Sequence, residues 1–385
     1  MKKKDVSRKN LGWQALLLHK KLGGKIRIVP ASPVRNRADL SLVYTPGVAV
    51  VSSLIARKPH LARMYTMKKR MVAVISDGSA VLGLGNIGAL GALPVMEGKA
   101  ALFKTFANVD AVPIVLDTQD PEKIVETVIH IAPAFGGINL EDFAAPKCFD
   151  IERRIIERLD IPVMHDDQHG TAVVVLAGLL NALKVVKKKI ETARIVISGA
   201  GAAGTATAHL LRKAGARHVT MLDSKGIIGI HRNDLTRHKT ELAGFTNPDD
   251  KRGNLQMALK GADVLIGVSG PGLATAADIR LMTKNAIVFA LANPTPEIMP
   301  DEARKGGAVV IATGRSDFPN QVNNSLAFPG IFRGALDNKV RRITEDMKLK
   351  AAHALANLVK KPTADKILPN MFDKRVAPAV AKVIR

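Results

Sequence analysis

Apolar positions along the chain form short β-branched runs that alternate with longer stretches of helical spacing. In the N-terminal part, the runs at 71–76 and 111–116 predict strands, and the stretches at 98–107 and 121–131 predict helices. Chains in which strands and helices alternate in this way build α/β domains around a parallel sheet. The pattern up to about residue 160 therefore predicts an α/β domain.

A second series of apolar runs begins at Ile161. Helices and turns rich in Gly, Pro and Asn separate its strands, and the chain after about Arg341 again has helical spacing. This arrangement predicts a doubly wound sheet followed by C-terminal helices. The strands are expected near Ile195, Val219, Val264, Ile287 and Val309.

A glycine-rich turn indicates what the second series binds. The turn at 199–204 follows a β-branched strand and opens a helix, so its glycines permit a tight turn and close approach of the backbone to a pyrophosphate. The next strand ends in Asp223, near the roughly 20-residue separation expected of the acid that binds a ribose 2′-hydroxyl. The turn residues expected to bind the dinucleotide are Gly199, Gly201, Ala202, Ala203 and Gly204.

These patterns divide the chain into two domains. We expect an N-terminal α/β catalytic domain at 1–160 and a Rossmann-type, doubly wound dinucleotide-binding domain with C-terminal helices at 161–385. No long linker separates the two parts, so the active site is expected in the cleft between them.

A second glycine pattern, at 83–88, lacks the context of the first. Gly91 and Pro94 are expected to interrupt the helix that should follow it, and the next strand acid, Asp117, lies too far along the chain. We interpret this segment as a substrate loop, with a plain structural turn as the alternative.

Composition and charge narrow the class of protein. The 385 residues are 47% hydrophobic and 24% charged, which is typical of a globular protein of two domains. The formal net charge is +23, but the basic runs are scattered and only 4% of residues are aromatic, so we expect no dedicated nucleic-acid site.

The single cysteine, Cys148, cannot form an internal disulfide, and no apolar run is expected to span a bilayer. We expect a soluble, cytoplasmic protein.

Two acidic pairs supply candidate metal ligands. Glu141 and Asp142 form one pair, and Asp166 and Asp167 form the other, between a strand-like run and the start of a buried helix. Adjacent acids are usually exposed turn residues, but the ends of strands beside helix N-termini are where α/β proteins bind ligands. Carboxylate oxygens favour Mg²⁺ or Mn²⁺ over zinc, for which the chain has no Cys/His cluster.

Four further side chains could act on a small substrate. Lys99 lies in an apolar helix start, where burial would lower its pKa and make it a base, and the alternative is a surface lysine. Tyr44, in a rigid Thr-Pro-Gly turn, could aim its phenol at a cleft or be an ordinary loop aromatic. Asn293 and Asn324 each follow an apolar strand, where they could bind substrate or nicotinamide or simply form turns.

Several short motifs in one order carry a family resemblance. From about Leu16 to Arg375 the chain resembles the malic enzymes, in particular the compact prokaryotic type. The motifs lie at 39–49 (DLSLVYTPGVA), 76–79 (SDGS), 83–88 (GLGNIG), 97–100 (EGKA), 139–143 (NLEDF), 165–172 (HDDQHGTA) and 321–330 (QVNNSLAFPG). The resemblance implies oxidative decarboxylation of L-malate to pyruvate and CO₂ with a nicotinamide cofactor and Mg²⁺ or Mn²⁺.

The resemblance also implies roles for the acid–base residues. By motif, Lys99 would remove the C2 hydroxyl proton of malate, assisted by Asp166, and Tyr44 would protonate C3 of enolpyruvate. Asn293 and Asn324 would orient the substrate, with Asn293 also at the cofactor. The metal ligands implied are Glu141, Asp142 and Asp167.

Some properties stay open at this point. Asp223 favours NAD because a carboxylate repels a 2′-phosphate, but Lys225 and Arg232 lie close in sequence and leave NADP possible. A homodimer is implied by resemblance alone. Ala80 stands where the larger malic enzymes carry an arginine, so the cation that meets the second malate carboxylate is not identified.

Two other kinds of function compete with this interpretation. The same residues could support malolactic conversion or oxaloacetate decarboxylation. A non-catalytic nucleotide-sensing or polyanion-binding protein is the alternative from a different class, and the presence of Tyr44, Lys99 and all the candidate ligands argues against it.

Overall fold

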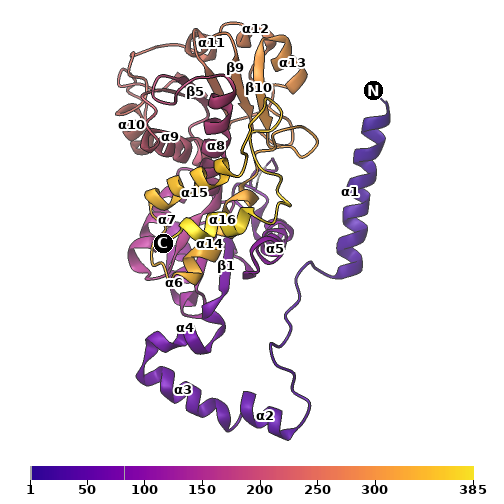
Figure 1. Ribbon diagram of the computed structural model, residues 1–385. Coiled ribbons are helices and arrows are strands. Elements are labelled where there is room, and N and C mark those ends of the chain that lie inside the picture. The colour runs from indigo at the N-terminus through magenta and orange to yellow at the C-terminus, as the bar shows by residue number, and fades with distance from the viewer. Residues whose placement is uncertain (1, 82) are drawn as a thin grey trace.

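The structure is a computed structural model that describes residues 2–81 and 83–385, with the backbone alone for residues 2–10. Its N-terminal part contains a parallel sheet in the order β2-β1-β3-β4, and a second sheet has the order β10-β9-β8-β5-β6-β7 (Figure 1). All pairs in the second sheet are parallel except β6 with β7. The predicted α/β class and the Rossmann-type second sheet are confirmed.

The strands predicted from the apolar runs are present, and β3 and β7 are two further strands that were not predicted. In the first sheet they are β1 (Met71–Ser76), β2 (Asp110–Val115), β3 (Gly137–Leu140) and β4 (Val163–His165). In the second sheet they are β5 (Arg194–Ser198), β6 (His218–Asp223), β7 (Gly226–Ile227), β8 (Val264–Gly267), β9 (Ala286–Ala290) and β10 (Ala308–Thr313).

Helices connect and cover the strands. The first sheet is accompanied by α5 (Gly88–Ala107), α6 (Pro121–Ile131), η3 (Ala132–Ala134), α7 (Lys147–Arg158) and α8 (Asp166–Val185). The second has α9 (Ala202–Lys213), α10 (Arg237–Ala243), α11 (Leu255–Leu259), α12 (Ala276–Ile279), α13 (Pro300–Lys305) and η4 (Asn324–Leu326). The C-terminal helices are α14 (Phe328–Asp337), α15 (Glu345–Asn357) and α16 (Val376–Val383). The N-terminal helices are α1 (Lys2–Leu22), α2 (Arg37–Val43), α3 (Gly47–Arg57), η1 (Pro59–Leu61), α4 (Ala62–Tyr65) and η2 (Met67–Lys69).

Strand β1 shows why the first sheet is buried on both faces. Side chains alternate along a strand, and Val72 and Val74 belong to the same apolar cluster as Phe103 of α5. Ala73 and Ile75 point the other way, into a cluster with residues of α6 and α7. A near-continuous apolar run is the expected sequence of a parallel strand covered by helices on each side.

Helix α5 contradicts one expectation. It runs without a break through Gly91 and Pro94, so the predicted interruption at these residues is wrong. Proline within a helix costs about 3 kcal/mol, but the turns that follow bury Met96, Ala100 and Phe103 almost completely. This tertiary packing outweighs the local preference.

The C-terminal helices return to the first sheet. Phe103 of α5 packs edge-on against Phe328 and Phe332 of α14, with ring centroids 4.6 and 5.5 Å apart. Helix α16 lies against α14, where a Cβ on Gly330 would contact Cβ of Val380 at 2.6 Å. The largest apolar cluster therefore contains residues of both sheets and of the C-terminal helices.

The first sheet extends beyond the predicted domain boundary at 160/161. Strand β4 pairs with β3, with Leu140 opposite His165, so it belongs to the first sheet. Helix α8 starts directly after β4 and continues into contact with α9 and α15. It is this helix that connects the two sheets.

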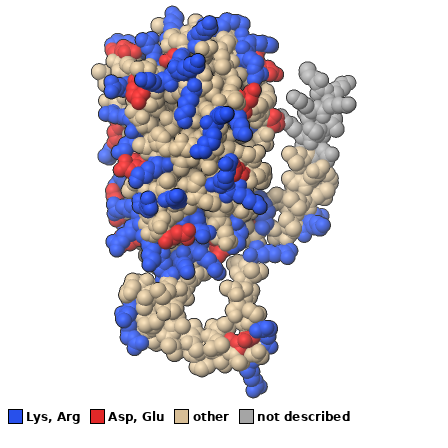
Figure 2. All heavy atoms as spheres, viewed as in Figure 1, with Lys and Arg blue, Asp and Glu red and all other residues tan. Residues whose placement is uncertain are grey.

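Residues 27–58, here called the N-terminal arm, stand clear of the rest of the chain. The arm contains α2 and α3, and none of its residues is buried. Figures 1 and 2 show it as a loop that leaves the body and returns, with open space inside it. On its N-terminal side Lys25 donates to Glu97 and to the carbonyl of Pro94, and on its C-terminal side Arg63 donates to the carbonyl of Leu336.

Two segments are apolar enough in composition to cross a membrane, which differs from the sequence-based expectation. One is Asp166–Val185, and 72% of its most apolar window is buried inside the protein, as in the core helix of a globular fold. The other, Arg37–Arg57, lies in the arm and is 0% buried, but α2 ends at Val43 and α3 begins at Gly47. These segments are weak evidence for membrane insertion.

Candidate active site

Parallel strands bring the two acidic pairs to one edge of the first sheet. Glu141 and Asp142 follow β3, while Asp166 and Asp167 form the first turn of α8 directly after β4. One carboxylate oxygen from each of Glu141, Asp142 and Asp167 lies within 4.8 Å of the others. The backbone N–H of Asp142 also donates to Oδ2 of Asp167 at 2.7 Å, which ties the two pairs together.

Lys99 reaches this cluster from α5. Its Nζ lies 2.7 Å from Oε1 of Glu141 and 2.7 Å from Oδ2 of Asp166, and the side chain is only 8% exposed. The ammonium group also lies 4.4 Å from the centre of the Phe328 ring at the start of α14. The alternative of a surface lysine is therefore excluded.

The expected direction of the Lys99 pKa shift is wrong for this state of the protein. Burial does lower the pKa, but the nearby carboxylates of Asp166, Glu141 and Asp167 outweigh it and raise the pKa above its ordinary value. Lys99 is therefore a charged partner of these acids here, and it requires a change in their charge balance before it can act as a base.

The acids carry more negative charge than one lysine can offset. Burial, the largest cause, raises the pKa of Glu141 and of Asp166 to about 7 and that of Asp167 to about 6. Oδ1 of Asp166 is buried without a hydrogen-bond partner among the described residues. Hard oxygen ligands crowded together in this way fit Mg²⁺ or Mn²⁺, with Glu141, Asp142 and Asp167 as the ligands.

We expect the affinity for Mn²⁺ to rise between about pH 5.5 and about pH 8. Below their raised pKa values Glu141 and Asp167 hold protons that the ion must displace, and above those values the oxygens are free to bind it. The affinity should increase by roughly tenfold per pH unit for each proton displaced. Calorimetric titration with Mn²⁺ at several pH values measures this, and an affinity that stays constant over the range would contradict the prediction.

A buried network behind the cluster was not foreseen from the sequence. Glu152 of α7 accepts hydrogen bonds from the backbone N–H of His165 at 2.7 Å and from Nε2 of Gln168 at 3.0 Å. His169 contacts the same carboxylate, and its other ring nitrogen lies 2.8 Å from Nζ of Lys348. The network holds the β4–α8 turn that carries Asp166 and Asp167. Glu152 lies on the buried stripe of α7 together with Cys148, Ile151 and Ile155. An acid on an otherwise apolar helix face was the feature of the sequence from which this network could have been predicted.

The predicted glycine turn lies between β5 and α9. Gly199 has φ +120°, and a Cβ there would contact the carbonyl oxygen of Val268 at 2.6 Å, so the turn requires glycine. A Cβ on Gly204 would overlap the carbonyl oxygen of Gly199, whereas one on Gly201 would meet nothing within 4 Å. The open side of Gly201, at the N-cap of α9, is thus where a pyrophosphate can approach the backbone.

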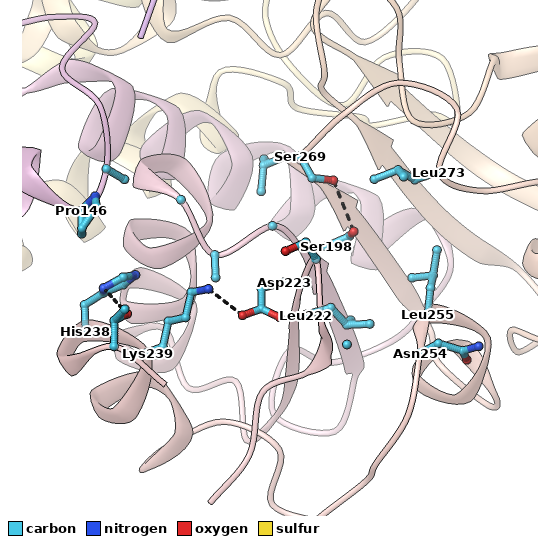
Figure 3. Close-up of a pocket in the computed structure, with 18 residues that line it drawn as sticks. Pro146, Ser198, Leu222, Asp223, His238, Lys239, Asn254, Leu255, Ser269 and Leu273 are labelled. Carbon is cyan, nitrogen blue, oxygen red and sulfur yellow. Dashed lines mark hydrogen bonds and ion pairs between the residues drawn. The ribbon is translucent and has the colours of Figure 1, made fainter. Parts of the chain in front are cut away.

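A cavity of about 790 Å³ opens beside this turn (Figure 3). Its lining includes Gly199, Gly201 and Asp223 from the second sheet and Ala145 and Pro146 from the first part of the chain, shortly after Asp142. The cavity therefore extends between the two parts of the molecule, as expected for a ligand cleft.

Asp223 lies at the end of β6, where two cationic side chains offset the charge of its carboxylate. Its carboxylate accepts hydrogen bonds from Nη1 of Arg232 at 2.7 Å and from Nζ of Lys239 at 2.6 Å. Figure 3 shows Lys239 pointing toward Asp223 across the cavity. These partners lower the pKa of Asp223 against the effect of its burial. Two cations thus contact this acid beside the cavity.

Asn324 lies beside the acidic cluster, and Asn293 lies against the second glycine loop. A Cβ on Gly170 would meet Cβ of Asn324 at 3.3 Å and would overlap Oδ1 of Asp166, so Asn324 lies beside the cluster. Asn293 lies against the second glycine loop, since a Cβ on Gly83 would contact its carbonyl oxygen at 2.8 Å. The loop at 83–88 therefore meets the second domain through Gly83.

Tyr44 is the predicted site residue that the structure does not bring to Lys99. It caps α2 in the N-terminal arm, and 66% of its surface is exposed. Within one chain, the expected position of this phenol in the active site is wrong, because the arm extends away from the body.

The comparisons with known proteins agree over nearly the whole chain. Residues 23–156 match the family model described as malic enzyme, N-terminal domain, and residues 168–384 match malic enzyme, NAD binding domain. The chain is similar to a bifunctional malic/malolactic enzyme of Bacillus subtilis (55% identity, covering 97% of this chain and 92% of the relative). It is also similar to an NADP-dependent malic enzyme of Halomonas elongata (52% identity, 92% and 84%). The crystal structure of an NAD-dependent malic enzyme from Thermotoga maritima aligns with a TM-score of 0.93 at 49% identity, covering 96% of this chain and 98% of that one.

Proposed function

The chain belongs to the malic enzyme family, and we propose that the Lys99 cluster, with the dinucleotide cavity beside it, is where the family reaction takes place. The enzyme oxidatively decarboxylates L-malate to pyruvate and CO₂ and reduces NAD or NADP. The observation that carries the assignment of the site is the contact of one buried lysine with Glu141, a member of the three-carboxylate cluster, and with Asp166 next to it.

In this proposal Lys99 takes the proton of the C2 hydroxyl as the C2 hydride leaves. Its Nζ already donates to Oδ2 of Asp166 at 2.7 Å, so Asp166 would accept the proton that Lys99 must first lose, once the charge of the neighbouring acids is offset. Glu141, Asp142 and Asp167 hold the divalent cation, whose chemistry is Lewis-acid stabilisation of the charge on the C2 oxygen.

Loss of CO₂ from the oxidised acid leaves an enolate, and C3 must then receive a proton. We assign this step to the phenol of Tyr44, and we assign the orientation of the substrate to Asn324 and Asn293. The half-buried position of Asn324 beside Gly170 and Asp166 supports the second assignment.

We propose NAD as the preferred cofactor, with NADP as a usable one. The carboxylate of Asp223 suits a ribose 2′-hydroxyl, while Arg232 and Lys239 reduce its repulsion of a 2′-phosphate. The similar proteins from Thermotoga maritima and Halomonas elongata are named as NAD-dependent and NADP-dependent, respectively.

A single assay tests the proposed function. With L-malate, NAD and Mn²⁺ or Mg²⁺, we expect reduced cofactor and pyruvate in equal amounts, no turnover after chelation of the metal, and a higher kcat/KM with NAD than with NADP. Lactate without net reduced cofactor would instead indicate malolactic conversion, an alternative kept because the Bacillus subtilis relative is named for both reactions.

We also propose that the enzyme is a cytoplasmic homodimer. Its one cysteine, Cys148, is buried and free, which suits a reducing compartment. The dimer is supported by the exposed apolar surface of the N-terminal arm.

A further inference from the structure

Lys348 is a buried lysine that the proposed reaction does not use. It lies on α15 and is only 6% exposed, with its Nζ 2.8 Å from Nδ1 of His169 and 2.7 Å from Oε1 of Glu345. Helix α15 packs on α8, whose first turn carries Asp166 and Asp167. A lysine is seldom buried unless its charge has a partner. One partner of Lys348 is a side chain two positions beyond a proposed metal ligand.

The contact with Lys348 fixes the position of the proton on the His169 ring. An ammonium group can only donate hydrogen bonds, so Nδ1 of His169 has to accept the bond from Lys348. A neutral imidazole then carries its proton on Nε2, and this nitrogen lies 3.0 Å from Oε2 of Glu152. The ring therefore donates to Glu152. Without Lys348 both tautomers of the ring are possible, and only one of them donates to this carboxylate.

Glu152 holds the chain on both sides of the two acids of α8. On the near side its Oε1 accepts from the backbone N–H of His165 at 2.7 Å, and on the far side its Oε2 accepts from Nε2 of Gln168 and from the ring of His169. Burial alone would raise the pKa of Glu152, but the contacts with His169 and the charge of Lys348 outweigh it and lower the pKa to about 2. Glu152 is thus charged at neutral pH and accepts from all three donors.

We propose that Lys348 is a positioning residue for the metal site and acts through His169 and Glu152 on the turn that carries Asp166 and Asp167. This rests on the proposed function, in which Asp167 is a ligand of the divalent cation. Among the described residues, those that line the dinucleotide cavity and those that form the three-carboxylate cluster do not include Lys348. Its effect on the cation is therefore indirect, and the C-terminal helices complete a site that the first sheet builds.

Removal of the charge of Lys348 tests this role. Lys348→Met keeps an unbranched side chain of similar length, and we expect it to weaken Mn²⁺ binding by about 10-fold to 100-fold, the usual cost of losing the support behind a metal ligand. NADH binding should be unchanged, which also shows that the variant has folded. Calorimetric titration measures both affinities.

Lys350→Met on the same helix is the matched control. Lys350 is exposed, so this variant loses the same charge without disturbing the buried network and should bind Mn²⁺ like the wild type. Unchanged Mn²⁺ affinity in Lys348→Met, or an equal loss in both variants, would overturn the proposal.

A double variant shows whether Lys348 acts through Glu152. If it does, Glu152→Gln/Lys348→Met should bind Mn²⁺ no more weakly than Glu152→Gln alone, because the second change removes support that is already lost. Losses that multiply would mean that the lysine acts by another route, and the proposed chain of contacts would be wrong. A wild-type enzyme that binds no Mn²⁺ would instead refute the proposed function.

The proton on His169 can also be located in the wild-type enzyme without any change to Lys348. Nitrogen NMR of protein with isotope-labelled histidine distinguishes the two tautomers, and the signals of this ring are those that disappear in His169→Gln. We expect a proton on Nε2 and none on Nδ1. A protonated Nδ1 would rule out the proposed role even if Lys348→Met failed to fold.

Discussion

Replacement of Lys99 by alanine will lower kcat for malate oxidation by about 10²-fold to 10⁴-fold, the range expected for loss of a general base. The amine is the one basic side chain found in contact with both Glu141 and Asp166 among the residues described, so no neighbour substitutes for it. The two acids lose the buried cation that lowers their pKa values, so these pKa values should rise further and the acids should take up protons. Steady-state kinetics with NAD and Mn²⁺ measures the change.

A structural collapse would mimic this loss, so the variant needs two further measurements. NADH binding should persist, because Lys99 is not among the residues that line the dinucleotide cavity. A small primary amine such as methylamine should restore part of the activity by occupying the space that the side chain leaves. Lys104→Ala on the same helix is the matched control, since that side chain is 58% exposed and should be dispensable. Wild-type turnover in Lys99→Ala would refute its role as base.

Replacement of Asp142 by asparagine will weaken Mn²⁺ binding by at least about 10²-fold and abolish turnover at ordinary metal concentrations. The change removes one negative charge from the three-carboxylate cluster but keeps the size of the side chain. Asp142 has φ +59°, a backbone conformation that asparagine tolerates well, so the turn after β3 should keep its shape. Calorimetric titration with Mn²⁺ gives the affinity directly.

Asp117→Asn is the matched control for this variant. Asp117 is exposed and lies just beyond the carboxyl end of β2, at the same edge of the sheet but outside the cluster. Its loss should leave both metal affinity and kcat unchanged. Equal effects of the two substitutions would show that overall charge at this edge, rather than direct ligation, governs metal binding.

Local sequence predicted the features that depend on neighbouring residues. The strand at 71–76 and the helix at 121–131 were predicted at the bounds now observed for β1 and α6, because their apolar periods are unambiguous. The turn at Gly199 was recognisable because strand, glycines and helix are contiguous. Asp166 and Asp167 were placed correctly at a strand end since β4 and α8 are adjacent in the chain.

Features that depend on distant residues were not predictable in this way. The pKa of Lys99 is governed by Asp166, 67 positions away, so the apolar neighbourhood alone gave the wrong direction. Pro94 stays helical because α14, more than 200 positions later, packs on the same helix. Tyr44 lies in an arm that stands clear of the body, and its local Thr-Pro-Gly turn gave no sign of this position.

The return of the C-terminal helices to α5 also has a consequence for synthesis on the ribosome. The helix that carries Lys99 is complete once residue 107 has been made, but the rings that cover Phe103 belong to Phe328 and Phe332. Domains usually fold in order as they emerge, yet here Phe103 stays uncovered until Phe328 and Phe332 have been translated. This face of α5 is therefore exposed while the strands of the second sheet are being made, and that sheet has the time to form first.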